Sequence, residues 1–303
     1  MGSDLRVFER GWLSSNNVLL AGEGGGAVLV DSSHCLHAAQ TVQLVRHGLC
    51  DEPLVGVVNT HLHSDHCGGN ATLQREFGAS VRIPPGQWQA ALDWDEQALS
   101  YAATRQRCER FEPQGKLEPG SALRVGRREW QVLAAPGHDP HSVILYDDAQ
   151  GVLISADALW ENGFGVVFPE LAGEPGFDEV AATLDLIAGL DARWVIPGHG
   201  APFGDVQDAL ARARGRLATL RADPARHTRY AAKVLLKYHL MEIRRQALPA
   251  LQRWCGETPY LHQAWRLLGQ PAGSLHGWCE SLVTELVDSG ALTLRDGVLH
   301  DAG

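Results

Sequence analysis

The segment THLHSDHCGG, residues 60–69, constrains the fold more than any other stretch of the chain. It follows the apolar run LVGVVNT, residues 54–60, which predicts a central strand covered on both faces. The residues after it, NATLQREFG, predict a helix that ends at Gly78 as a C-terminal cap. Three histidines and one aspartate therefore lie on a loop between a strand and a helix. Imidazole and carboxylate groups gathered on one loop indicate a metal site.

More residues able to bind metal follow other apolar runs. His138 ends the segment LAAPGH, Asp157 follows LISA, and His199 ends WVIPGH. A closely spaced pair of divalent ions needs about seven protein groups. The sequence supplies that number at the ends of predicted strands: His61, His63, Asp65, His66, His138, Asp157 and His199.

Composition narrows the class of protein. The 303 residues are 45% hydrophobic and 20% charged, which is typical of a globular protein. No run of 18 apolar residues is present, so we expect no membrane span. The start, MGSDLRVFERG, lacks a basic region followed by an apolar core, which favours a cytoplasmic protein. Six cysteines without a C-x-x-C pair fit a reduced compartment and exclude a thiolate metal cage.

The first two-thirds of the chain predicts strands with a few helices. NVLLAGEGGGAVLVDSS reads as a hairpin with a glycine-rich turn, and no helix follows it, which argues against a nucleotide loop. Four later segments predict strands: EWQVLAAPGH, SVILYDD, GVLISADA and ARWVIPGHG. A covering helix is predicted by the spacing of Phe177, Val180, Leu184 and Ile187.

Near residue 205 the composition changes to Arg- and Ala-rich helical sequence. Asp223 and Pro224 predict the start of a helix that continues to about Gln246. Three helical segments follow in outline, and then Asp296-Gly297 in ALTLRDGVLH predicts a hairpin. This order is typical of a winged helix. We therefore predict a catalytic domain at residues 1–205 and a smaller helical, winged-helix-like domain at residues 206–303.

The motif H-x-H-x-D-H, preceded by Thr60 and followed by Gly68-Gly69-Asn70, resembles that of the metallo-β-lactamase superfamily. The resemblance covers about residues 5–205 and is nearest to the glyoxalase II branch. It implies an α/β fold, an αββα sandwich, in the first domain. It also implies two divalent metal ions, most often zinc, with iron or manganese as alternatives. One ion would be held by His61, His63 and His138, the other by Asp65, His66 and His199, with Asp157 bridging them and Asp31 supporting the site.

Two departures from the family pattern bear on the substrate. The chain has GHDPHS where many relatives have Gly-His-Thr-x-Gly-Ser, and Ala156 stands where a glycine commonly precedes the bridging aspartate. No ligand is lost, so we expect metal binding with a differently shaped pocket beside His138. Two side chains next to the ligands are expected to have turn or packing roles, His141 and Cys67. Three aromatic residues either line the pocket or pack in the core: Trp160, Phe164 and Phe168.

The resemblance implies an enzyme, a dinuclear metal-dependent hydrolase that uses a metal-bridging hydroxide. Asp65 would bind metal and also orient this hydroxide. The predicted substrate is a small ester, thioester or lactone, as in hydroxyacylglutathione hydrolase. Two alternatives stay open. One is a metal-dependent endoribonuclease or phosphodiesterase of the lactamase-like type, and the other is a non-catalytic metal-binding regulator.

A basic stripe follows one face of the helix predicted after Pro224. Residues 212–245 carry ten cations and two acids in a chain of net charge −10. The stripe is either a solvated helix face, which we favour, or a clamp for a small anionic acyl substrate. The predicted recognition helix, residues 272–289, contains no lysine or arginine, which disfavours nucleic-acid binding. The sequence leaves open whether the chain forms a homo-oligomer. The stripe consists of Arg226, Arg229, Lys233, Lys237 and Arg244.

Overall fold

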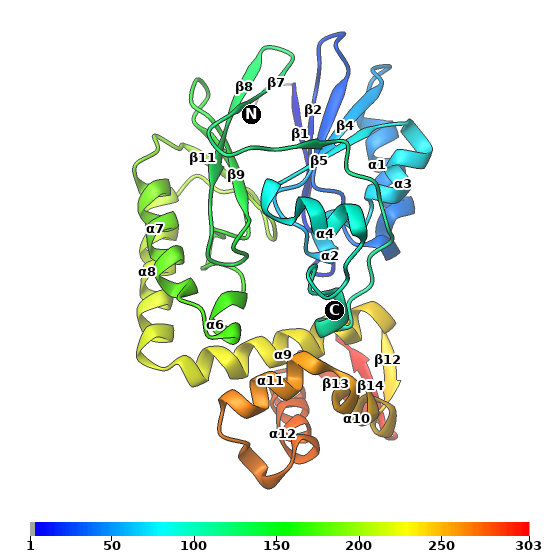
Figure 1. Ribbon diagram of the computed structural model, residues 1–303, viewed down its shortest axis with the longest axis vertical. Coiled ribbons are helices and arrows are strands. Elements are labelled where there is room, and N and C mark those ends of the chain that lie inside the picture. The colour runs from blue at the N-terminus through cyan, green and yellow to red at the C-terminus, as the bar shows by residue number, and fades with distance from the viewer. Residues whose placement is uncertain (1–3, 303) are drawn as a thin grey trace. The chain divides into compact units, whose positions relative to one another are not determined.

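The computed structural model describes residues 4–302 (Figure 1). By its internal contacts the chain divides into two compact units. Unit 1 is Met1–Leu99 with Arg107–Ala218, and unit 2 is Ser100–Gln106 with Thr219–Gly303. This division lies within helix α8 (Val206–Ala222), a little beyond the predicted boundary at residue 205. The predicted extents of the two domains stay predictions.

The first sheet of unit 1 has six strands in chain order. Strands β2 and β3 pair antiparallel, with Val18 opposite Val30, which confirms the predicted hairpin. Strand β4 pairs in parallel with both β3 and β5, so the run before the histidine loop is a central strand as predicted. The strands are β1 (Leu5–Phe8), β2 (Asn17–Leu20), β3 (Ala27–Val30), β4 (Leu54–Val58), β5 (Ser80–Ile83) and β6 (Gly115–Lys116).

The second sheet has five strands in the order β11-β10-β9-β8-β7. Neighbours pair antiparallel except β10 and β11, which are parallel. The four later segments predicted as strands are found here as β8 to β11. The strands are β7 (Ala122–Val125), β8 (Arg128–Ala134), β9 (Val143–Asp147), β10 (Val152–Ala156) and β11 (Trp194–Pro197).

The two sheets share one hydrophobic core. Val30 and Val58 of the first sheet belong to the same buried cluster as Trp130 and Ile154 of the second. Each large apolar side chain buried here stabilises the fold by about 1.5–3 kcal/mol. The sheets therefore form the two inner layers of the predicted sandwich, since their apolar faces exclude water together.

Helices form the outer layers of unit 1 (Figure 1). Helix α3 (Asn70–Phe77) packs on β4 and β5 and against α1 (Ala38–Gly48). It ends at Gly78 with φ +66°, which confirms the predicted cap. Helix α7 (Gly176–Ala188) buries its predicted apolar face, as expected of a covering helix. The αββα sandwich expected from the sequence is confirmed.

Several short helices were not predicted, because each is too short for a periodic pattern. One of them, α2 (Ser64–Cys67), forms a single helical turn from four residues of the predicted histidine loop. None of the described helices is long and apolar enough to cross a membrane. The other elements are η1 (Cys35–His37), η2 (Pro85–Gln87), α4 (Trp88–Asp93), α5 (Tyr101–Thr104) and α6 (Phe168–Ala172).

Unit 2 is mainly helical. The Asp223 side chain accepts a hydrogen bond from the Arg226 backbone N–H, which confirms the predicted N-cap. The helix ends at Ile243, three residues before the predicted end, because Arg244 has φ +69° and the next residues form a strand. The elements are α9 (Pro224–Ile243), β12 (Arg245–Ala247), α10 (Leu248–Glu257), α11 (Pro259–Leu267), η3 (Pro271–Gly273), α12 (Leu275–Asp288), β13 (Leu292–Arg295) and β14 (Val298–Asp301).

The predicted C-terminal hairpin is present. Strands β13 and β14 pair antiparallel around Asp296 and Gly297, and β12 pairs with β14 to complete a small sheet. Both turn residues have positive φ, 49° and 74°, as a two-residue turn of this kind requires. The assignment of unit 2 as a winged helix stays a prediction.

Most cations of the basic stripe form ion pairs within unit 2, where two carboxylates offset part of its charge. Arg229 and Lys233 both form ion pairs with Glu285 of α12. Lys237 and Arg244 both pair with Asp301 of β14, whose side chain is only 2% exposed. Four of the five cations therefore tie α9 to its neighbours in the same unit. This arrangement favours a structural role for the stripe over a substrate clamp.

We expect Asp301→Asn to lower the free energy of unfolding by about 1–3 kcal/mol, because it leaves two cations without their buried partner. Glu257→Gln is the matched control, since Glu257 pairs with Arg105 at the surface of the same unit, where side chains are 62% and 37% exposed. That control should lose less than about 1 kcal/mol. Urea denaturation measures both changes, and equal losses would contradict the structural role of Asp301.

Candidate metal centre

The seven predicted ligands all lie at one edge of the sandwich. Strands β8, β10 and β11 run in the same direction, since β9 is antiparallel to β8 and β10 while β11 is parallel to β10. Their carboxyl ends therefore share an edge, and the end of β4 joins it through a hydrogen bond from Val143 N to Thr60 O of 2.9 Å. We call this set the seven-residue cluster: His61, His63, Asp65, His66, His138, Asp157 and His199.

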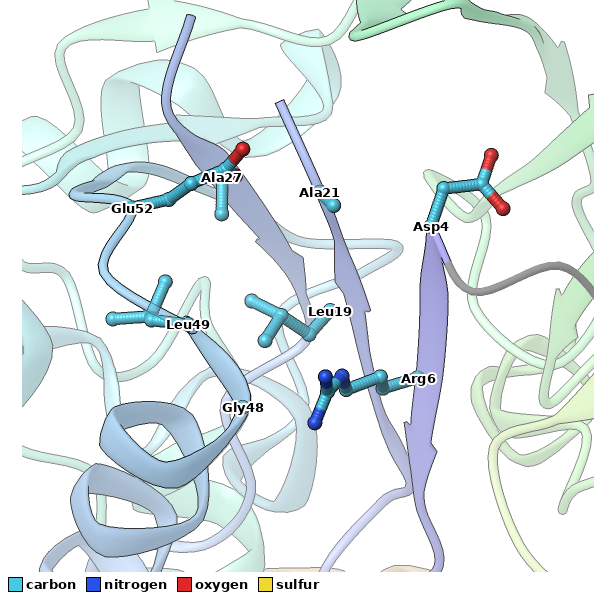
Figure 2. Close-up of a pocket in the computed structure, with 8 residues that line it drawn as sticks. All are labelled: Asp4, Arg6, Leu19, Ala21, Ala27, Gly48, Leu49 and Glu52. Carbon is cyan, nitrogen blue, oxygen red and sulfur yellow. The ribbon is translucent and has the colours of Figure 1, made fainter. Parts of the chain in front are cut away.

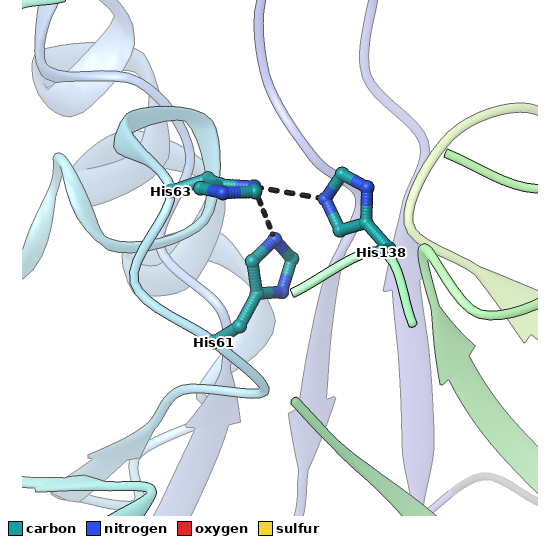
Figure 3. A group of neighbouring side chains, drawn as sticks. All are labelled: His61, His63 and His138. Carbon is teal, nitrogen blue, oxygen red and sulfur yellow. Dashed lines mark hydrogen bonds between the residues drawn. The ribbon is translucent and has the colours of Figure 1, made fainter. Parts of the chain in front are cut away.

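Three imidazoles form the first half of the cluster (Figure 3). His63 Nδ1 lies 3.0 Å from His61 Nε2 and 2.8 Å from His138 Nε2. All three residues are buried. Three ring nitrogens that converge in this way repel one another when they are protonated. A single metal cation bound by their lone pairs would replace this repulsion with attraction.

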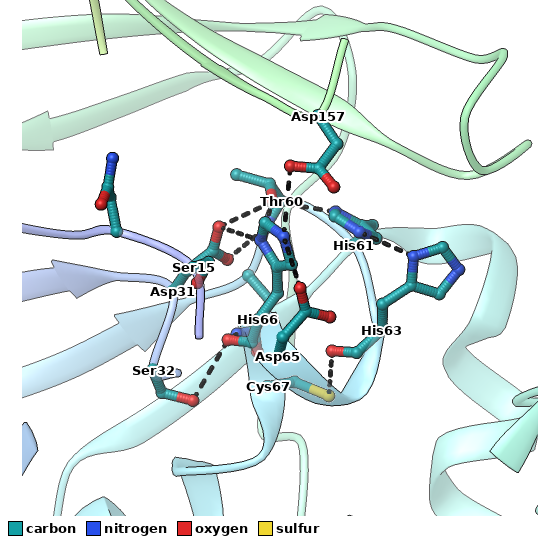
Figure 4. A network of polar contacts seen from close by, with 12 residues as sticks. Ser15, Asp31, Ser32, Thr60, His61, His63, Asp65, His66, Cys67 and Asp157 are labelled. Atoms are coloured by element: carbon teal, nitrogen blue, oxygen red, sulfur yellow. Dashed lines mark hydrogen bonds and ion pairs between the residues drawn. The ribbon is translucent and has the colours of Figure 1, made fainter. Parts of the chain in front are cut away.

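The second half comprises Asp65, His66 and His199 (Figure 4 shows the first two). Asp65 Oδ2 lies 3.0 Å from His199 Nε2 and 3.7 Å from His66 Nε2. Asp157 faces both halves. Its Oδ2 is 3.4 Å from His138 Nε2, and its Oδ1 is 3.4 Å from His66 Nε2. The carboxylate thus stands between the two groups, where the resemblance to the family places a bridging ligand.

Neighbouring oxygens set the orientation of the imidazole rings. Asp31 Oδ2 accepts from His66 Nδ1 at 2.8 Å and from Thr60 Oγ1 at 2.8 Å. Thr60 Oγ1 in turn lies 3.1 Å from His61 Nδ1, and Val166 O lies 2.6 Å from His138 Nδ1. Each of these three rings can therefore keep a proton on Nδ1 and face the cluster with Nε2.

The electrostatics of the cluster fit divalent metal binding. Burial, aided by nearby His66, lowers the pKa of His61 well below its usual value, and burial lowers the pKa of His63 to about 4. Both rings are then neutral ligands at neutral pH. Burial would raise the pKa of Asp65, but His66 and His199 outweigh it and lower that pKa to about 2.

A buried nitrogen without a hydrogen-bond partner supports the same fit. His66 Nε2 has no hydrogen-bond partner among the described residues, although it is fully buried between Asp65 and Asp157. Burial would lower the pKa of His66, but the carboxylates of Asp157, Asp31 and Asp65 raise it well above the usual value. A positive charge is therefore favoured at this point, and a metal ion supplies it as well as a proton does.

A supporting residue that the sequence analysis missed is Asn16. Its side chain is buried and donates to Pro197 O at 2.9 Å and to Gly200 O at 2.7 Å, on either side of His199. The preceding backbone N–H, of Ser15, donates to Asp65 O. This segment thus connects residues 60–69 to the loop that carries His199, two loops that both contribute to the second half. The polar run SSNN directly before an apolar strand was the available signal.

Aromatic side chains flank the cluster. Trp160 Nε1 donates to Asp157 Oδ1 at 3.2 Å, and the Phe168 ring centre lies 4.7 Å from that of His63. Trp12, which was not predicted, stacks on His199 at 5.3 Å and is 57% exposed. Phe164 is 1% exposed and belongs to the core. Of the three predicted aromatics, two border the cluster and one packs inside.

The GHDPHS segment forms a tight turn beside His138. Asp139 Oδ1 accepts from the His141 backbone N–H at 2.8 Å, and Asp139 Oδ2 lies 3.9 Å from His63 Nε2. The His141 ring packs on Gly86, where a Cβ would stand 2.1 Å from its Nδ1. His141 therefore lies in a turn and belongs to neither group of the cluster. Cys67 is fully buried, as its expected packing role requires.

A pocket at strands β1 to β3 lies away from the cluster (Figure 2). Its empty volume is about 210 Å³, and Asp4, Arg6 and Glu52 are its charged lining residues. Asp4 is already paired with Arg128. The lining includes none of the seven predicted ligands.

The position before Asp157 is strained. Ala156 has φ +47°, in the left-handed region where a Cβ costs about 1–2 kcal/mol. This explains why a glycine commonly stands there in the family. The strain turns the chain sharply at the end of β10 and directs Asp157 into the cluster.

We expect Ala156→Gly to raise the free energy of unfolding by about 1 kcal/mol, because relief of the strain exceeds the entropy cost of a glycine. Ala134→Gly is the matched control at an exposed position of β8 with ordinary strand geometry. It should instead lower stability by about 0.5–1 kcal/mol. Denaturant unfolding compares the two, and a loss of stability in both variants would argue against strain at residue 156.

The fold and the cluster together define a two-sheet α/β protein with a histidine–aspartate centre suited to divalent metal. Residues 10–199 match the Metallo-beta-lactamase superfamily, and this range includes all seven positions of the cluster. The chain therefore belongs to this family.

Named relatives and solved structures agree with this assignment. The chain is 28% identical to a hydroxyacylglutathione hydrolase of Anaeromyxobacter dehalogenans over 224 residues, 71% of this chain and 76% of that protein. It is 27% identical to the acyl-coenzyme A thioesterase MBLAC2 of Bos taurus over 165 residues, 50% of this chain and 58% of that protein. A metallo-beta-lactamase family protein of Thermus thermophilus has the same fold, with a TM-score of 0.60, 21% identity and 98% of both chains covered.

Proposed function

We propose that this chain is a dinuclear metal-dependent hydrolase of a small ester, thioester or lactone, with acyl thioesters as the preferred class. The observation that carries the proposal is the Asp157 carboxylate, which presents one oxygen to His138 and the other to His66. Family membership and relatives named as hydrolases support a metal-dependent hydrolase. The thioester preference is taken from the names of those relatives.

The donor set suits two divalent ions. His61, His63 and His138 would hold one, and Asp65, His66 and His199 the other, with Asp157 shared. Five imidazoles and two carboxylates favour zinc and also suit iron or manganese. Such ions, when bound, acidify water toward a pKa of about 7 and polarise a carbonyl oxygen.

The chain's own residues then orient and shield the reacting groups. Asp31 and Thr60 hold the imidazole rings with Nε2 turned inward. Asp65 is an acceptor on the second half of the cluster and can orient the attacking water. Trp12 and Trp160, whose ring centres are 5.5 Å apart, form an apolar wall beside His199 that suits an acyl chain and limits the entry of bulk water.

Charge in unit 2 argues against the nucleic-acid alternative. The predicted recognition helix corresponds to α12, whose Glu285 already binds Arg229 and Lys233. Cations that are paired internally lose much of their attraction for phosphate. Small acyl substrates are therefore favoured over RNA.

We expect two metal ions per chain. Protein stripped with a chelator and reloaded with zinc, iron or manganese should bind two, as measured by elemental analysis. His199→Ala should reduce the number to one, because it removes a ligand from one half only. His141→Ala is the matched control and should keep two. A firm stoichiometry of one in the wild-type protein would exclude the dinuclear site.

A substrate panel tests the reaction class. We expect kcat/KM to be highest for acyl-glutathione and acyl-coenzyme A thioesters, lower for lactones, and negligible for a phosphodiester reporter and single-stranded RNA. Asp157→Ala should lower kcat at least about 100-fold, because this carboxylate would help to hold both metal ions, which supply the chemistry. Faster cleavage of RNA than of any thioester would replace the proposal with the endoribonuclease alternative.

A further inference from the structure

Two thiols from distant parts of the sequence lie side by side in unit 1. Cys67 ends helix α2 directly after His66, and Cys108 lies in residues 106–114, which contain no helix or strand. Their sulfur atoms are 3.8 Å apart, across 41 positions of sequence. The sequence predicts a packing role for Cys67 and no particular role for Cys108.

The two thiols differ in exposure. Cys67 is 0% exposed, and its sulfur lies 3.3 Å from His63 O and 3.4 Å from Leu62 O (Figure 4). Cys108 is partly exposed. A small oxidant from solvent therefore reaches Cys108 first. Cys67 is buried next to it, close enough to react with the oxidised Cys108 sulfur. This is the arrangement of a peroxide-reactive cysteine and its resolving partner.

We propose that Cys67 and Cys108 form a peroxide-sensitive dithiol site that closes to a reversible disulfide. The Cys108 sulfur attacks hydrogen peroxide, the O–O bond breaks, and Cys108 sulfenic acid forms with release of one water. The Cys67 sulfur then attacks the Cys108 sulfur, the S–O bond breaks, and a second water leaves. The two thiols lose two electrons and two protons in total, and the peroxide is reduced to two waters.

The short distance between the two sulfur atoms means that we expect a local shift to be enough for the bond. The sulfur atoms must approach from 3.8 Å to about 2.05 Å. Cys67 is buried in α2, whereas Cys108 lies outside any helix or strand, so we expect Cys108 to make most of this movement. The disulfide would then connect the loop that carries four of the seven cluster residues to residues 106–114.

Other cysteines of the chain provide internal controls. Cys255 and Cys279 in unit 2 are each 1% exposed. The hydrogen bond between them, followed by burial, raises the pKa of Cys255 far above its usual value. This pair should resist peroxide as long as the protein stays folded. Cys50 is exposed, and its sulfur accepts from Arg6, so it reports general surface oxidation.

The test treats the folded full-length protein with hydrogen peroxide and maps disulfides by non-reducing peptide mass spectrometry. We expect a Cys67–Cys108 cross-link in most chains, reversed by dithiothreitol, with Cys255 and Cys279 still reduced. The same result is expected in Cys50→Ser. Cys67→Ser should accumulate a sulfenic acid at Cys108 that dimedone traps, because the resolving thiol is gone. The serine hydroxyl has nearly the shape of the thiol and can donate to one of the two carbonyls, of His63 or Leu62, so we expect this variant to fold, which circular dichroism checks.

Three outcomes would overturn the proposal. One is a Cys108 cross-link to Cys35, whose sulfur lies near the neighbouring Arg107 carbonyl at 3.4 Å. Another is oxidation of Cys50 alone. The third is a Cys67–Cys108 bond that forms only together with a Cys255–Cys279 bond, since that would report unfolding. Every readout is a mass, so the test does not depend on the proposed hydrolase activity.

Discussion

The Asp31 carboxylate accepts hydrogen bonds from the Thr60 backbone N–H, the Thr60 hydroxyl and His66 Nδ1, at distances of 2.8 to 2.9 Å. It is buried, and a buried carboxylate is costly unless its oxygens are satisfied in this way. The same contacts join the end of β3 to the end of β4 and set the direction of the His66 ring. The cluster depends on this network, because a ring that turned its proton inward could not bind metal.

Backbone geometry around the cluster follows from the need to bring side chains from separate strands to one point. Asp31 and Ala156, at the ends of β3 and β10, both have positive φ, which costs energy but turns the chain sharply out of the sheet. A close contact at Gly198 also helps to bring the side chains together. A Cβ at this position would stand 2.2 Å from Asp157 Oδ1, so a residue without a side chain is needed there. The stability of the two-sheet core offsets these local costs.

Strong periodic patterns made most of the fold predictable. The central strand before the histidines, the helix up to Gly78 and the covering helix α7 all follow from continuous or helical spacing of apolar residues. The short helix α2 and the end of α9 at Ile243 could not be predicted from such patterns. They depend on single backbone conformations and, for α9, on the pairing of the next strand with β14. The ion pairs between the basic stripe and Glu285 and Asp301 could not be predicted from the sequence either, since the partners come from distant segments.

The sequence by itself determined the identity of the candidate ligands, because H-x-H-x-D-H and three further residues at strand ends leave few other uses for so many imidazoles and carboxylates. It also predicted most of the strands, while their arrangement in an αββα sandwich was implied by the resemblance of the motif to the family. Only the tertiary structure decided that Asp157 faces both halves of the cluster, that Asn16 and Trp12 border it, and that Cys67 meets Cys108. Those relations join residues tens to nearly two hundred positions apart, and side-chain packing, which local pattern does not encode, sets their distances.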